Sequence, residues 1–296
     1  FPRNRQMMGK LWAEVLLPEE TGSAPLCLRL TDPDAHMRLS APVVGSLSAV
    51  TGYHLRRLSV SAVLTLFMLA IGVLSLVAFV YMGHKRLPER RFLDAAAFLL
   101  LCSLWCLTDS ALYQIYGRDT AAGSVVSFYA FMLMSIPMVH FVRNTISGRR
   151  RLVPDICIAL FCANALAQGA AYWLFGIRFI DMLPLTHLLL AAGVAAMLTV
   201  LLRSYREQPS QQLRLRIAAF AALGVFGVAA LVLYGLLHIY WYDVIFQFGV
   251  LLFIILLFRE LLGQAAEDMR FHMEHRISHL MQREDRMTGL PNRRAF

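Results

Sequence analysis

Three polar side chains within long apolar stretches are the best candidates for binding a ligand in this 296-residue sequence. They are Asp109, Gln168 and His187, and Asn164 lies one helical turn before Gln168. Placing a polar group in hydrocarbon is costly, so such residues often mark a binding site. The three lie at comparable depth in their stretches, which predicts that they line one cavity. The alternative is that they join helices through hydrogen bonds.

Two cysteines have a spacing that can suit a metal ion. Cys102 and Cys106 are four residues apart and would share one face of a helix. No third or fourth ligand stands beside them in the sequence, whereas structural metal sites commonly use four. We therefore expect the pair to pack as small hydrophobic residues and predict no metal site.

The composition indicates a membrane protein. Hydrophobic residues make up 58% of the chain and charged residues 16%, against rough averages of 45–50% and 25% in soluble domains. The net charge of +9 comes from 26 arginines and two lysines against 19 acidic residues. A basic balance of this kind fits nucleic acid, anionic lipid or membrane topology, and the placement of the arginines decides among them.

Seven apolar stretches are long enough to cross a bilayer as helices, which takes about 20 residues. They predict a mostly α-helical, polytopic membrane protein in contact with the lipid bilayer. Pro137 in the third stretch and Pro184 in the fifth would bend or begin helices. The predicted spans are Leu58 to Met82, Leu93 to Tyr116, Ala121 to Val142, Leu152 to Phe175, Ile180 to Leu202, Ile217 to Leu237 and Val244 to Leu262.

The positive charges gather in alternate loops. Twelve lysines and arginines follow the first, third and fifth spans, whereas the other loops carry only Arg118 and Arg178. Arg56 and Arg57, just before the first span, count against this bias without overturning it. The positive-inside rule then places the N-terminal segment outside and the C-terminus in the cytoplasm. Topology accounts for the basic charge, so we predict no nucleic-acid partner. The twelve are Lys85, Arg86, Arg90, Arg91, Arg143, Arg149, Arg150, Arg151, Arg203, Arg206, Arg214 and Arg216.

The last twelve residues form a dense motif. Gly289 can adopt the positive φ of a tight turn, Pro291 cannot continue a helix, and Asn292 is a good helix cap. The run resembles the opening of a GGDEF-type diguanylate cyclase domain, with Met287 where that family mostly has leucine. The matching residues are Asp285, Thr288, Gly289, Leu290, Asn292, Arg293 and Arg294.

The resemblance implies an enzyme that condenses two GTP molecules into cyclic di-GMP with Mg²⁺, as a homodimer. In that family the catalytic and metal-binding acids and the Gly-Gly-(Asp/Glu)-Glu-Phe turn come well after this opening. The sequence contains no Gly-Gly pair, so we expect no catalytic residue in it and the stretch to be only the start of the domain. The alternative is a non-enzymatic membrane receptor whose output domain is degenerate.

The segments on either side of the spans differ in character. Residues 1–57 are less apolar, and the runs Lys10 to Leu17 and Leu26 to Leu30 are typical of strands, so we expect part of a β-rich outer domain. After the last span, Met269 and Met273 continue a coiled-coil seam, which shifts between Arg276 and Ile277 and reaches Leu280. We expect two chains to pair there, or else an amphipathic helix that lies against lipid.

Together these features predict four segments in a sensor of the bacterial inner membrane. The architecture resembles seven-transmembrane receptors with diverse intracellular signalling modules. We expect the membrane region to regulate the cyclase in response to an outside or intramembrane stimulus. The segments are a partial β-rich outer segment at 1–57, the seven-helix sensor at 58–262, a cytoplasmic signalling helix at 263–284 and the start of the cyclase domain at 285–296.

Overall fold

The computed structural model describes residues 15, 42–84, 90–110, 113, 120–146, 148–235 and 242–283, and within 264–283 only some side chains. All regular structure in these ranges is helical. The strands predicted between Lys10 and Leu30 fall outside the described residues, apart from Val15. The same holds for the motif residues Asp285, Thr288, Gly289, Leu290, Asn292, Arg293 and Arg294.

Seven helical stretches are long and apolar enough to cross a membrane, as the sequence predicts. Their mean hydropathy and length together give the chain the make-up of a polytopic membrane protein. Two helices, α4 and α5, together form the third stretch, Ala121–Thr145. The elements are α1 (Leu47–His84), α2 (Arg90–Asp109), α4 (Thr120–Leu133), α5 (Ser135–Thr145), the 3₁₀ turn η1 (Gly148–Arg151), α6 (Leu152–Phe175), α7 (Phe179–Glu207), α8 (Gln211–Gly235) and α9 (Tyr242–Arg283).

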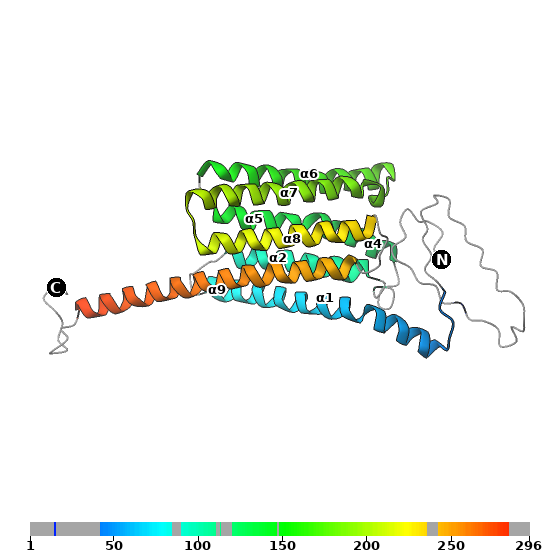
Figure 1. The fold of residues 1–296 in the computed structure, drawn as a ribbon, viewed down its shortest axis with the longest axis horizontal. Coiled ribbons are helices and arrows are strands. Elements are labelled where there is room, and N and C mark those ends of the chain that lie inside the picture. Colours follow the sequence, from blue (N-terminus) through cyan, green and yellow to red (C-terminus); the bar gives the residue numbers. More distant parts are fainter. Residues whose placement is uncertain are drawn as a thin grey trace, which may run out of the picture.

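The helices run up and down beside one another in one bundle (Figure 1). The starts of α2, α6 and α8 and the ends of α1, α5 and α7 share the end from which α9 projects. That end also carries Arg90, Arg143, Arg150 and Arg214. The cationic loops predicted from the sequence therefore gather at one end of the bundle, insofar as the structure describes them.

Helix α1 starts earlier than the sequence predicts. Residues 47–57, assigned above to a β-rich outer segment, form its first turns. The Ser46 hydroxyl accepts a hydrogen bond from the Ala49 amide at 3.3 Å, which caps this start. No proline interrupts the helix between Val50 and His54, which stand one turn apart. This part of the β prediction is wrong, because a good cap and continuous helix-compatible residues outweigh the lower hydropathy.

The third stretch breaks at Met134, which separates α4 from α5. Pro137 lies at the third position of α5, and because it has no N–H the carbonyl of Leu133 loses its usual helical partner. Pro137 therefore stands in the first turn of α5, which begins two residues before it, whereas the sequence left open whether it bends or begins a helix. Pro184 lies inside α7, whose helix continues through it.

The buried core runs between α2, α5, α8 and α9. On α9, Val250, Phe253, Leu257 and Leu261 recur on one face and are buried. The Phe253 ring packs edge-on against the ring of Phe98 on α2, with 5.4 Å between the ring centroids. The ring of Phe220 on α8 also packs edge-on against Phe253, with 5.2 Å between the centroids. Gly249 lets α8 approach closely, since a Cβ at that position would overlap Phe226. The helix that leaves the bundle is thus also part of its centre.

Helix α9 continues without a break for 42 residues. Its last span ends at Gly263, and the remaining 20 residues to Arg283 extend about 30 Å at 1.5 Å per residue. The helical exit segment that the sequence predicts is present. Pairing of two such helices as a coiled coil stays a prediction.

Candidate functional site

Gln168 lies in a closed hydrogen-bond cluster between α6 and α7. Its side-chain amide donates to Asn164 Oδ1 and to Thr186 Oγ1, both at 2.8 Å. All three side chains are buried. Asn164 and Gln168 stand one turn apart on α6, so both face Thr186 across the helix interface. The cluster joins two helices, which is the hydrogen-bonding role weighed for these residues above.

His187 and Asp109 lie at other helix junctions. The His187 ring, half-buried on α7, meets the ring of Phe131 edge-on at 5.6 Å. Asp109 ends α2 and accepts a hydrogen bond from the Tyr242 hydroxyl, at the start of α9, at 3.4 Å. The three predicted residues therefore serve the α6–α7, α4–α7 and α2–α9 junctions. Whether any of them binds a ligand stays a prediction.

A second buried polar cluster joins α1 to α9. The Gln247 amide donates to Ser61 Oγ at 2.9 Å and to Thr65 Oγ1 at 3.3 Å. Ser61 in turn donates to Asp243 Oδ2 at 3.3 Å. Within the described part of the chain, the other amide atom, Gln247 Oε1, is buried without a hydrogen-bond partner. This cluster joins the first span to the last. It lies near the end of the bundle that the sequence predicts to be the outer one.

A charged cluster lies toward the opposite end, between α2 and α5. Asp94 is buried, with its Oδ1 2.7 Å from His140 Nδ1. The Asn144 amide donates to Asp94 Oδ2 at 2.9 Å. His140 and Asn144 are one turn apart on α5, so one face of that helix holds both carboxylate oxygens. Sequence reasoning missed this cluster, although an acid at the second residue of the predicted span Leu93 to Tyr116 is a signal for it.

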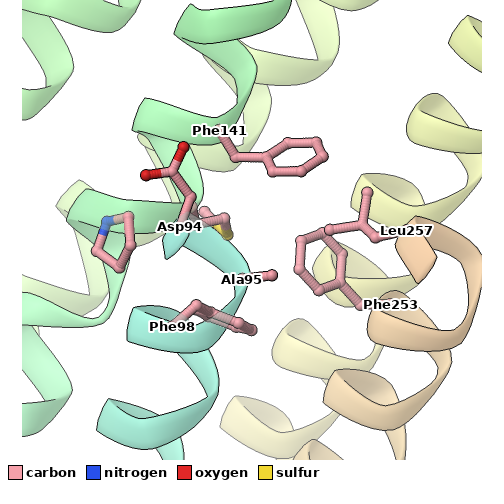
Figure 2. Close-up of a pocket in the computed structure, with 8 residues that line it drawn as sticks. Asp94, Ala95, Phe98, Phe141, Phe253 and Leu257 are labelled. Carbon is pink, nitrogen blue, oxygen red and sulfur yellow. The ribbon is translucent and has the colours of Figure 1, made fainter. Parts of the chain in front are cut away.

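A small cavity lies beside Asp94, where α2, α5 and α9 meet. Figure 2 shows Asp94 on one side of it and Phe253 and Leu257 of α9 on the other, with Phe141 between them. Its volume is about 10 Å³, about the room that one water molecule needs. The lining is apolar apart from Asp94, with Ala95, Phe98, Pro137 and Met138 completing it. The hollow is too small for an organic ligand, and its lining includes residues of α9, the helix that leaves the bundle.

A buried ion pair joins α8 to the exit of α9. Arg216 is 5% exposed and Glu260 2%. The Arg216 Nε–H donates to Glu260 Oε1 at 2.7 Å, and a second guanidinium nitrogen contacts the same oxygen. Glu260 stands three residues before Gly263, where the last span ends. The pair therefore fixes α9 at the point where it leaves the bundle.

Each of these buried polar contacts joins two neighbouring helices: α6 and α7, α1 and α9, α2 and α5, and α8 and α9. Among the residues that the structure describes, no group of three or more histidine, cysteine, aspartate or glutamate side chains is placed to hold a metal ion. Comparison with protein-family models, with curated proteins and with solved structures gives no match.

Proposed function

We propose that this chain is the membrane sensor and signal-transduction region of a diguanylate cyclase. The observation that carries the proposal is the unbroken course of α9, which spans the bundle and continues to Arg283. Two residues later, at Asp285, begins the run that resembles the start of a cyclase domain. A continuous helix is a rigid connection, so a change in the packing of α9 would reach the domain that follows.

The polar junctions of α9 suggest where a signal would act. Gln247 binds α1, the Tyr242 hydroxyl binds α2, and Glu260 binds α8. These three contacts lie along one helix from its start to its exit. A stimulus that favours one set of contacts over another would shift α9 between two packings. The size of the shift is limited by the difference in the stimulus's affinity for the two packings.

We further propose that the protein lies in the bacterial inner membrane, with Phe296 on the cytoplasmic side where GTP is available. The support is the charge bias of twelve against two between alternate loops. Fusions of a reporter that is active only in the periplasm should be silent at Arg150 and active at Arg118. A fusion of a cytoplasm-only reporter at the same positions is the control and should give the reverse pattern. Periplasmic activity at Arg150 with silence at Arg118 would overturn the orientation.

The enzymatic part of the proposal needs a chain that continues past Phe296 through the predicted cyclase domain. In detergent or nanodiscs, with GTP and Mg²⁺, such a chain should form cyclic di-GMP, detected by mass spectrometry. The chain ending at Phe296 should form none, since it has no Gly-Gly turn. The matched control is the extended chain with the acidic residue of that turn changed to its amide, which should also be inactive.

Two results would count against the cyclase. Product made by the 296-residue chain would show that the chemistry lies elsewhere. A folded, GTP-binding extended chain that stays inactive would favour the alternative, a non-enzymatic receptor whose output domain only binds nucleotide or a partner.

A further inference from the structure

Two sulfur atoms meet between α2 and the junction of α4 with α5, and the residue that carries a third stands one turn along α2. The Cys102 thiol donates a hydrogen bond to Met134 Sδ at 3.5 Å. Cys102 is 0% exposed and Met134 4%. Cys106, also buried, stands one turn along the same face of α2. Met134 lies 32 residues from Cys102 in the sequence, so their contact could not be predicted from spacing along one helix.

A ring contact holds the Cys106 end of α2 against the same part of α4. Trp105, next to Cys106, packs on Phe131 at 5.2 Å, and Phe131 lies one turn before Met134. Met134 joins α4 to α5 with helical backbone angles, φ −63° and ψ −22°, and its N–H donates to the Ala130 carbonyl at 3.0 Å. Its unbranched thioether can reorient more readily than a β-branched side chain.

The separation of the sulfurs is close to what a shared ion requires. Two sulfurs each about 2.3 Å from one metal ion are about 3.8 Å apart at a tetrahedral angle. The Cys102–Met134 separation of 3.5 Å is a few tenths shorter. Small changes in side-chain torsions would be enough to admit an ion between them.

We propose that Cys102, Cys106 and Met134 form a binding site for a soft monovalent metal ion, Cu(I). Thiolate and thioether sulfur select such ions over hard cations. When Cu(I) binds, it replaces the Cys102 thiol proton, which passes to solvent, so the net charge of the site stays zero. A neutral site suits an apolar interior, whereas one thiolate with Zn²⁺ would leave a buried positive charge. This site does not depend on the cyclase proposal.

The test starts from a variant in which these are the only thiols. Of the five cysteines, Cys157 and Cys162 lie on α6, and they can be changed to serine together with Cys27. The purified 296-residue chain and this triple variant are titrated anaerobically with Cu(I) against a coloured Cu(I) chelator. Both should bind one ion per chain with the same affinity. X-ray absorption should show only sulfur in the first coordination shell.

Single changes in that background assign the ligands. Cys102→Ser and Met134→Leu should each weaken Cu(I) binding by at least about tenfold, the lower end of what even a supporting residue costs at a metal site. Met132→Leu is the matched control, since Met132 is equally buried and lies two residues away. It should bind like its parent. Thermal unfolding without metal, at a temperature well above that of the titration, shows that each variant compared is folded.

The triple variant keeps Cys102, Cys106 and Met134, which should suffice to bind one ion per chain. The inference fails if this variant does not bind Cu(I) at one-to-one stoichiometry. It fails equally if Cys102→Ser and Met134→Leu bind Cu(I) as tightly as their parent. Nitrogen or oxygen in the first coordination shell would place the ion at another site and would also overturn it.

Discussion

Arg216→Met should lower the free energy of unfolding by about 3–5 kcal/mol, because it leaves the Glu260 carboxylate buried without its cation. Both side chains lie almost entirely inside the bundle, and Arg216 donates twice to one carboxylate oxygen. Glu260→Leu should cost a similar amount, by leaving the guanidinium buried alone. Equilibrium unfolding in mixed micelles, or steric trapping in a bilayer, measures these differences.

The double variant is the informative one. Arg216→Met with Glu260→Leu replaces the pair by apolar side chains of similar volume, so its stability should return to within about 1–2 kcal/mol of the parent. Arg178→Met is the matched control, since Arg178 pairs with Asp181 at 2.9 Å in a more exposed place. It should cost no more than about 1 kcal/mol. A harmless Arg216→Met, or a double variant as unstable as the single ones, would contradict this account of the pair.

The helices could be predicted from the sequence because their signal is local. The fourth span, Leu152–Phe175, has the bounds that its apolar run predicts. The second ends at Asp109 instead of Tyr116, and the first begins at Leu47 instead of Leu58. At those two positions the chain mixes polar and apolar residues. Caps and packing therefore decide where the helix begins or ends, and hydropathy carries no information on either.

The partners of the polar side chains could not be predicted, because they depend on which helices pack together. Gln168 was singled out from its place in an apolar run, but its contact with Thr186 follows from the packing of α6 on α7. The contact between Asp94 and His140 could not be predicted either, because the two residues lie 46 positions apart in the sequence. Cys102 and Met134 are similarly distant. Apolar periodicity shows which face of a helix is buried, but not which other helix packs against that face.

Inserting alanines after Gly263 in the extended chain should change cyclase output periodically. Each inserted residue turns the following helix by about 100° and advances it by about 1.5 Å. Two or five insertions leave the output domains facing away from their former direction, whereas seven return them to within about 20°. Among the residues that the structure describes, a Cβ at Gly263 would meet nothing within 4 Å, so alanine has room at the insertion point.

Two or five inserted residues should lower the rate of cyclic di-GMP formation by roughly tenfold or more, since even a 1 Å misplacement of reacting groups can cost about 100-fold. The seven-residue insertion is the matched control and should stay near the parent rate, because it adds one heptad to the seam. Cysteines placed at Met273 and Leu280 should crosslink two chains if the exit helices pair. Equal activity across all insertions would make α9 a passive tether, and no crosslink at either position would remove the homodimer through this helix.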